Sequence, residues 1–457
     1  MFDSTFWFKA MELLLSLSLL VFIHELGHFM WARIFKVGVE KFYLFFDAYN
    51  FALLRWNKKG LHLFDFIHFP TLVNPTNTEY GIGWVPLGGY CAIVGMIDET
   101  HNAEQADTDR PDAFVKKGKF AQFMIMAGGV INNLILAVII YIGMAWHWGA
   151  DILEIKNIPY GLEYSEVAKN VGFQEGDIPV AVDGQPVRDI LSFQNDLLLA
   201  NDVTVRRQGQ EVKIALPDTL GTHFLEHRDI ALFVTMRQPM VVEQAMENSE
   251  AKRIGLQEGD SIVSVDSVPT LWATDVTRAL RAKANQEVQI SFYRGDSLYT
   301  QTAQLDAEGK LGFYTKNIIG LQYFTHIEYS FFESIPVGLE RGWNMLYNYV
   351  RQFKLVFTKQ GAKEIGGFGS MGKIFPEEWI WKAFWSLTAF ISVALAFMNI
   401  LPIPALDGGH IAILIVEAII RRPLSDKVKD RLQYIGFAFI ILLMVAVNDN
   451  DIIKAFF

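Results

Sequence analysis

Hydrophobic side chains gather in four long runs toward the two ends of the chain, at about residues 6–23, 120–146, 383–401 and 434–447. The first run continues with helical spacing through residues 24–30. A helix needs roughly 20 consecutive apolar residues to cross a bilayer, and each run is near that length. The pattern predicts an α-helical polytopic membrane protein with four transmembrane helices.

Basic residues beside these runs predict the orientation of the helices. The basic residues lie in three segments: one follows the first helix, one precedes the second, and one joins the third to the fourth. They are Arg33, Lys36, Lys41, Lys116, Lys117, Lys119, Arg421, Arg422, Lys427, Lys429 and Arg431. Each terminal tail carries one basic residue, Lys9 or Lys454. The positive-inside rule therefore places the basic segments in the cytoplasm, and both termini and residues 148–325 outside.

The stretch between the second and third runs is polar enough for a soluble region, and it contains an internal repeat. Residues 168–187 and 251–270 lie 83 positions apart and are identical at 11 of 20 positions. In each copy a turn bounded by glycines precedes an aspartate and a run of alternating apolar residues, which is typical of a half-buried strand. The repeat predicts a small domain copied in tandem, because solenoid repeats are shorter.

Two further segments are neither spanning helices nor ordinary loops. Residues 37–97 hold the strand-like sequences VEKFYLFF and YGIGWVPLGGYCAIVGM. Backbone at membrane depth must be buried against protein, so we expect a membrane-reentrant β-hairpin region here. Residues 328–357 have the pattern of an amphipathic helix that lies at the membrane interface.

These patterns predict five regions along the chain. They are residues 1–147 (helices one and two with the β region), 148–235 and 236–320 (the two repeat copies), 321–372 (the amphipathic helix and a linker) and 373–457 (helices three and four).

The composition of the chain limits the classes of function and of metal site that are possible. Hydrophobic residues make up 51% of the chain, which excludes general disorder, and the net charge of -10 excludes an electrostatic footprint for nucleic acid. The single cysteine, Cys91, excludes an intramolecular disulfide and cysteine-rich zinc modules. Any bound metal must therefore rely mainly on histidine, aspartate and glutamate.

The sequence His24-Glu25-Leu26-Gly27-His28 ends the first apolar run. On a helix, residues four apart lie on one face, so both imidazoles can reach one zinc ion. Glu25 can reach the metal-bound water and act as general acid and base. The other interpretation is a polar cluster satisfied by neighbouring helices, but polar groups at the end of a spanning helix are costly unless they are used.

Catalytic zinc commonly has three protein ligands, and the candidate for the third is Asp407 in the sequence LPIPALDGGH. From spacing alone, Asp407 could equally be the N-cap of the following helix, and His410 is the competing ligand. Pro402 and Pro404 break the helix before it and could expose backbone groups to an extended substrate. They could also be simple helix terminators.

Asn132 and Asn133 follow Gly128 and Gly129 in the second run. From the residues alone, the better interpretation is close packing of helices through small residues, with an amide hydrogen bond between them.

Taken together, these motifs resemble the site-2 protease family of intramembrane zinc metalloproteases, in its bacterial form with tandem PDZ domains between helices two and three. The resemblance covers nearly the whole chain and rests on HELGH, GGVIN at 128–132, the two GxxxGD repeats and NILPIPALDGG at 399–409. It implies two mainly-β PDZ domains at 148–235 and 236–320, and a site in the bacterial inner membrane.

The resemblance also implies roles for individual residues. His24, His28 and Asp407 would bind Zn²⁺, and Glu25 would be the acid and base. Asn399, Pro402, Pro404 and Asn132 would hold or shape the substrate. The β region would present an edge to it. The implied substrates are single-pass membrane proteins that were first trimmed outside the membrane, of the anti-sigma-factor and remnant-signal-peptide kind.

Three departures from the family pattern concern how substrate is presented. Gly129 stands where the motif GPxxN has proline, FYLFFDAYN (42–50) replaces a Gly-Phe-Gly hairpin, and residues 62–81 look like an insertion. The PDZ copies could bind substrate C-termini, for which Leu311-Gly312-Phe313 is a weak signal, but we favour a steric filter against bulky substrates. Two other functions stay open: a non-proteolytic PDZ-bearing membrane scaffold with a zinc site, and a zinc transporter.

Overall fold

The computed structural model describes residues 4–86, 88–96, 107–158, 160–187, 189–197, 200–217, 220, 233–316, 318, 323–358 and 368–456. The chain divides into two compact units. Unit 1 consists of residues 1–149 and 328–457, and unit 2 of residues 150–327. Each is described separately below.

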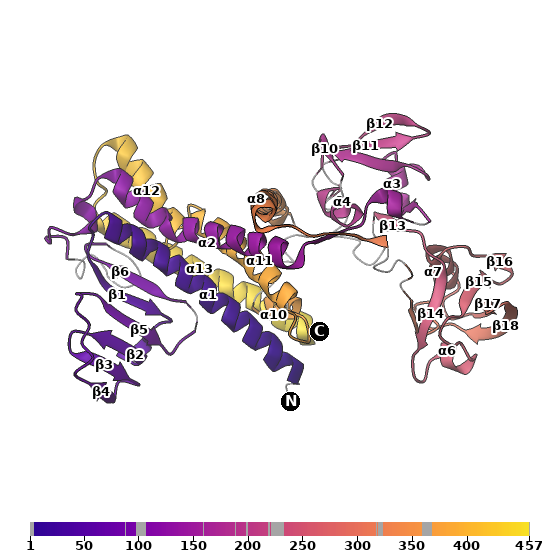
Figure 1. Cartoon of the computed structure of the whole chain (residues 1–457), viewed down its shortest axis with the longest axis horizontal. Helices are drawn as coiled ribbons and strands as arrows, with labels where there is room; N and C mark the ends of the chain where they lie inside the picture. Colours follow the sequence, from indigo (N-terminus) through magenta and orange to yellow (C-terminus); the bar gives the residue numbers. More distant parts are fainter. Residues whose placement is uncertain are drawn as a thin grey trace. The chain divides into compact units, whose positions relative to one another are not determined.

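Three helices of unit 1 are long and apolar enough to cross a membrane (Figure 1). They are α1 (Ser4–Ile34), α2 (Lys119–Trp148) and α11 (Trp381–Ile400), and they contain the first three predicted spans. The predicted fourth span lies within α13 (Asp426–Phe456), of which the fully described part does not meet the same criterion. Four spans therefore remain a prediction.

Glycines let α1 and α2 approach at backbone distance. A Cβ atom added to Gly27 would lie 2.2 Å from the carbonyl oxygen of Gly128, and one added to Gly128 would lie 2.7 Å from that of Gly27. Real Cβ atoms do not come so close, so any side chain at either position would push the helices apart. The glycine inside HELGH thus brings the metal-binding motif against α2.

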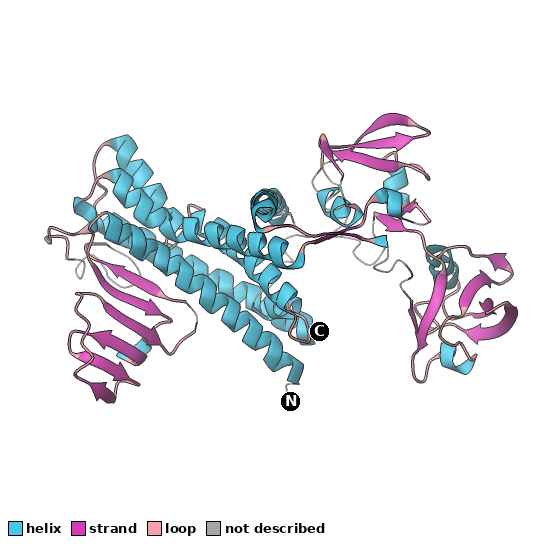
Figure 2. Cartoon of the chain, viewed as in Figure 1, coloured by secondary structure: helices cyan, strands magenta, loops and turns pink. Residues whose placement is uncertain are grey.

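Unit 1 also contains a six-stranded sheet, in the order β4-β3-β2-β5-β1-β6. Figure 2 shows it as a ladder of strands beside the helices. Its strands are β1 (Val39–Leu44), β2 (Ala52–Asn57), β3 (Gly60–Leu63), β4 (Ile67–Phe69), β5 (Glu79–Gly83) and β6 (Tyr90–Ile93). A short 3₁₀ turn, η1 (Ala48–Asn50), connects β1 to β2, and a second, η2 (Phe114–Lys116), precedes α2.

The predicted β-hairpin is wrong in topology. β1 pairs with β5 in parallel and with β6 in antiparallel, so it lies between two strands that both come later in the chain. A parallel pair needs a long connection, and β2, β3 and β4 supply it. The apparent insertion at 62–81 is part of this connection, since it provides the end of β3, all of β4 and the start of β5.

The predicted amphipathic helix is present as α8 (Phe331–Phe353), followed by the 3₁₀ turn η5 (Lys354–Phe357). A capping box between Ser330 and Glu333 starts α8. Gly338 and Gly342 face α2, where an added Cβ would meet Ile142 and Val138. Several large apolar residues of α8 are nevertheless exposed, namely Phe331, Phe332, Leu339, Trp343, Tyr347 and Val350. Placement at a membrane interface stays a prediction. A short helix, α10 (Phe368–Ile374), precedes α11.

Helix α12 (Asp407–Ile420) is fastened to its neighbours by one buried carboxylate. Glu417 is 3% exposed, forms ion pairs with Lys119 of α2 and Lys429 of α13, and accepts a hydrogen bond from the backbone of Leu424. Burial alone would raise the pKa of Glu417. The hydrogen bonds from Lys119, Lys429 and Leu424 outweigh that effect and hold the pKa below its ordinary value.

Replacing Glu417 with glutamine is expected to destabilise unit 1 by about 3 kcal/mol, because two ammonium groups lose their shared buried partner. The wild-type carboxylate contributes fully at neutral pH, and its contribution is lost as the pH falls below about 4.5, through the lowered pKa of the folded state. Thermal unfolding of the full chain in detergent should show a large difference between wild type and variant at neutral pH and a smaller one at a pH well below 4.5.

The matched control is Glu378→Gln, at an exposed glutamate before α11. It should shift the unfolding temperature by little at either pH. An equal effect of the two substitutions would contradict the role given to Glu417.

Unit 2 contains two copies of one arrangement, each with its own hydrophobic core. The first copy has β8 (Leu162–Tyr164), α3 (Glu166–Asn170), β9 (Ile178–Val182), β10 (Gln185–Pro186), α4 (Ile190–Leu197), β11 (Asp202–Arg207), β12 (Gln210–Ala215) and β13 (Val234–Met236). The second has β14 (Met240–Ala245), α6 (Glu250–Arg253), β15 (Ser261–Val265), β16 (Val268–Pro269), α7 (Ala273–Arg281), β17 (Glu287–Arg294), β18 (Ser297–Gln304) and β19 (Phe313–Thr315). Strand β7 (Ala150–Ile152) pairs with β20 (Thr325–Ile327) where the chain enters and leaves the unit, and η3 (Ile155–Asn157) follows β7.

The aspartate of each GxxxGD repeat has the same structural role. Asp177 and Asp260 have fully buried side chains that pair with Arg207 and Arg294, at 2.7 Å in both copies. Each arginine also donates to a backbone carbonyl of the preceding turn, at Gly172 or Gly255. The repeat in the sequence therefore encodes a buried ion pair that closes the turn onto the sheet.

Candidate metal centre

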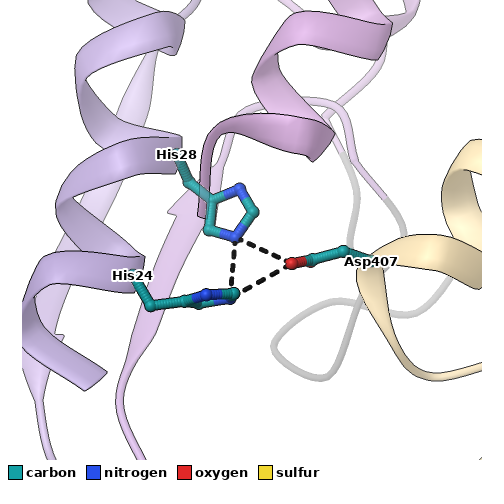
Figure 3. Close-up of side chains that lie close together, drawn as sticks. All are labelled: His24, His28 and Asp407. Atoms are coloured by element: carbon teal, nitrogen blue, oxygen red, sulfur yellow. Dashed lines mark hydrogen bonds and ion pairs between the residues drawn. The ribbon is translucent and has the colours of Figure 1, made fainter. Parts of the chain in front are cut away.

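Two turns of one helix and the start of another bring three candidate ligands together. His24 and His28 lie on one face of α1, and Asp407 is the first residue of α12 (Figure 3). The Nε2 atoms of the histidines are 3.2 Å apart, and Asp407 Oδ2 lies 3.1 Å from that of His24 and 3.4 Å from that of His28. These residues form the one group of three or more potential metal-binding side chains found in the described part of the chain.

The triangle of donor atoms has the size that a tetrahedral zinc site requires. Zinc–nitrogen and zinc–oxygen bonds of about 2.0–2.1 Å imply ligand atoms separated by roughly 3.3–3.4 Å. The observed edges of 3.1, 3.2 and 3.4 Å are close to that value. Asp407 Oδ2 is buried without a hydrogen-bond partner, as expected of an atom whose partner is an ion. The donor set therefore fits zinc.

Local sequence explains why Asp407 reaches the two histidines. Leu406 occupies the N-cap position of α12 and makes no side-chain cap, so the structure does not support Asp407 as N-cap. Gly408 and Gly409 press against the preceding loop, where added Cβ atoms would lie 2.1 Å from the Leu401 carbonyl oxygen and 2.4 Å from that of Ile403. Both glycines are needed for the loop to fold back onto α12 and carry Asp407 inward.

A cavity of about 330 Å³ opens at the three candidate ligands. Glu25, Asn399 and His410 line it, so the predicted acid and base and the predicted substrate-holding amide share one space with the ligand set. His410, the competing ligand, is outside the group of three. Strand β6 also lines the cavity, together with Gly88 and Gly89 just before it.

Three of the four predicted substrate residues do not line the cavity. Asn132 donates from Nδ2 to the backbone carbonyl of Ile23, at 3.4 Å, and is not part of the cavity lining. Pro402 is exposed and Pro404 half-buried in the loop between α11 and α12, and neither lines the cavity. A role of these residues in holding or shaping the substrate stays a prediction.

The sequence did not predict two contacts to the histidines. The backbone carbonyl of Ile125 accepts a hydrogen bond from His28 Nδ1 at 2.8 Å. The side chain of Asn133 lies against His24, with Nδ2 at 3.4 Å from Nδ1. The doubled asparagine was visible in the sequence, but adjacent helix residues point about 100° apart, and spacing alone cannot tell which one faces α1.

A pair of histidines in HExxH spacing, completed by an aspartate inside a bundle of membrane-spanning helices, defines a membrane metallopeptidase. Comparison with known protein families identifies the family of metallopeptidases to which the chain belongs. The model of Peptidase family M50 matches residues 12–443. The chain belongs to this family, that of the site-2 proteases, and it is an intramembrane zinc metalloprotease.

Full-length relatives support this placement. The Escherichia coli "Regulator of sigma-E protease RseP" is 27% identical, over 98% of this chain and 99% of that protein. The Haemophilus influenzae "Regulator of sigma E protease" is 22% identical, over 98% of this chain and 100% of that protein. A Neisseria meningitidis protein named "Putative zinc metalloprotease NMA0084" is 25% identical, over 96% of this chain and 97% of that protein.

Among solved structures, the PDZ domain of an SdrC-like protein from Listeria monocytogenes is similar to a small part of the chain. It is 17% identical, covers 17% of this chain and 86% of that structure, and has a TM-score of 0.16. That score is too low to assign the fold of either copy in unit 2.

Proposed function

We propose that this enzyme performs regulated intramembrane proteolysis in the bacterial inner membrane, on single-pass membrane proteins already trimmed outside. The observation that carries the proposal is the single cavity that holds the three candidate ligands, Glu25 and an edge strand. His24, His28 and Asp407 hold the zinc. When bound, zinc lowers the pKa of a water and polarises the scissile carbonyl.

Glu25 is the general acid and base. It lies one residue from His24 on α1 and lines the cavity. A water oxygen attacks the scissile carbonyl carbon, and Glu25 takes the proton that the water releases. Glu25 then gives a proton to the leaving nitrogen as the carbon–nitrogen bond breaks.

Strand β6 holds the substrate in an extended form. It is the outermost strand of the sheet beside β1, and its residues Tyr90, Cys91 and Ile93 line the cavity. An edge strand offers unpaired backbone groups to an incoming strand, and a transmembrane helix must unwind before its peptide bonds become accessible. Asn399, at the end of α11 on the same cavity, can hold the backbone of the unwound segment.

The two copies in unit 2 are tandem PDZ domains, outside the membrane, that act as a steric filter. Their repeated order of strands and helices and the flanking basic charges support this part of the proposal. A filter explains why the substrate must first be trimmed, because a bulky outer domain could not pass. The substrates are of the anti-sigma-factor and remnant-signal-peptide kind, in keeping with the names of the two sigma-E relatives.

Cleavage of a model single-pass substrate by the purified full chain in detergent tests the proposal. Wild type should cut a trimmed substrate. Glu25→Gln should keep its zinc and lose activity by about 10²–10⁴-fold, the usual contribution of a general acid and base. Bound zinc, measured in both proteins, is the control that separates lost chemistry from a lost site.

Wild-type protein that holds zinc but never cuts any trimmed substrate would contradict proteolysis and favour the membrane scaffold. Zinc uptake into vesicles that survives Glu25→Gln would favour a transporter, since transport does not need a proton shuttle to a peptide bond.

A further inference from the structure

The side chain of Asn133 is a buried polar group that the proposed reaction does not use. Asn133 lies on α2, has no exposed surface and lines the metal cavity. Its Nδ2 atom is 3.4 Å from His24 Nδ1, and its Oδ1 atom has no hydrogen-bond partner. A buried amide oxygen without a partner costs free energy and calls for a physical explanation.

The two histidines differ in what holds the ring nitrogen that points away from the ligand triangle. His28 Nδ1 donates to the Ile125 carbonyl at 2.8 Å, a group that can only accept. That bond keeps the proton on Nδ1 and leaves the Nε2 lone pair for a metal. His24 Nδ1 instead faces the amide of Asn133, which can either donate or accept.

We propose that Asn133 is a positioning residue for the metal site, which fixes the ring and the tautomer of His24. The proposal rests on the proposed function in one respect, that His24 Nε2 binds the metal. In the metal-bound state His24 Nδ1 carries the proton and donates a hydrogen bond to Asn133 Oδ1. That oxygen thereby gains the partner that it lacks. The amide reaches this state by a half-turn about its last torsion, which leaves its shape unchanged.

The arrangement in the structure suits the metal-free tautomer. With its proton on Nε2, His24 places an N–H toward the Asp407 carboxylate, whose Oδ2 lies 3.1 Å away, while Asn133 Nδ2 donates to Nδ1. One side chain thus serves both states of the same ring. A carbonyl at this place, like that of Ile125 beside His28, would serve only one.

Asn133 is well held for this task. Its backbone carbonyl accepts a hydrogen bond of 2.7 Å from Ser392 of α11, which fixes this turn of α2. One turn earlier, Gly129 lies directly against the His24 ring, where an added Cβ would be 2.4 Å from Cε1. The ring is therefore confined by packing, and Asn133 supplies the polar contact at its Nδ1 atom.

The test compares metal affinity in three variants of the full-length protein in detergent, by competition with a chromophoric chelator for zinc. Asn133→Leu removes the acceptor at similar volume and should weaken zinc binding by about 10–100-fold, as loss of an outer partner of a ligating histidine does. Asn133→Asp keeps an acceptor for Nδ1–H and should bind zinc within about threefold of wild type or more tightly. Asn132→Leu changes the neighbouring amide, which contacts the Ile23 carbonyl, and should leave the affinity unchanged.

A second measurement reports the hydrogen bond itself. In the cobalt-substituted protein, the paramagnetically shifted Nδ1–H proton of His24 should exchange slowly with water in wild type and Asn133→Asp. It should exchange fast in Asn133→Leu.

Zinc affinity in Asn133→Leu equal to that of wild type would overturn the proposal. So would an Asn133→Asp variant as weak as Asn133→Leu, because a purely packing role gives a charged replacement no advantage. These affinities decide the role of Asn133 whether or not the protein cleaves a substrate. A wild type that binds zinc yet never cleaves would therefore overturn the proposed function alone, whereas a wild type that binds no zinc would overturn both.

Discussion

Replacing Asp407 with alanine is expected to empty the metal site. Two histidines would remain, and the buried oxygen that lies 3.1 and 3.4 Å from their Nε2 atoms would be gone. Loss of an outer partner of a ligand already weakens metal binding by about 10–100-fold, so loss of a ligand itself should exceed roughly a hundredfold. Zinc content of the purified full chain, measured after dialysis against a weak chelator, should fall close to zero, and proteolysis with it.

The matched control is His410→Ala, three residues further along the same helix. His410 lines the same cavity but lies outside the ligand group, so its removal should leave zinc content near that of wild type. The opposite pattern, with zinc kept in Asp407→Ala and lost in His410→Ala, would make His410 the third ligand. It would also leave Asp407 with a purely structural role at the start of α12.

Replacing Gly129 with alanine is expected to displace His24 from the ligand triangle. The new Cβ would lie 2.4 Å from Cε1 and 2.6 Å from both ring nitrogens, which no real contact allows. The ring must rotate or the two helices must separate, and either change lengthens the distances to His28 and Asp407. Zinc affinity should fall by more than about tenfold, and proteolysis should fall at least as far.

Gly143→Ala offers a matched control on the same helix. Nothing lies within 4 Å of a Cβ at Gly143, so alanine there has room and removes a glycine from a helix interior. It should leave zinc binding unchanged and raise stability by up to about 1 kcal/mol. Equal zinc affinities in the two variants would show that the close contact between Gly129 and His24 is not maintained in solution.

The Gly129 prediction is specific to this chain. The family motif has proline where this sequence has Gly129, and proline carries a Cβ. The departure noted in the sequence thus lies at the residue that packs against the His24 ring.

Local spacing was enough to predict several features. His24 and His28 are four positions apart, and helix geometry alone then puts both imidazoles on one face of α1. Length and hydropathy predicted α1, α2 and α11, because the requirement for a spanning helix is local. The GxxxGD repeat located two equivalent turns, although not the arginines that pair with their aspartates.

Contacts between distant residues could not be predicted in this way. From the sequence, Asp407 could be a metal ligand or the N-cap of the following helix, and His410 could be the ligand in its place. Nothing local records how a loop folds back against a helix nearly the whole chain away. The predicted β-hairpin failed for the same reason. Strand patterns mark residues 39–44 and 79–83, but which strands become neighbours depends on the path of the long connection between them, which no local pattern records.

The sequence by itself determined the class of this protein, because its spanning helices, its HExxH pair and its internal repeat can be recognised from local patterns and from self-similarity. The tertiary structure alone decided which distant groups complete the site. It brought Asp407 to the histidines, placed β6 on their cavity and turned Asn133, rather than Asn132, toward His24. The physical reason is that these contacts depend on how closely backbones can approach, and glycines at 27, 128, 129, 408 and 409 set that distance.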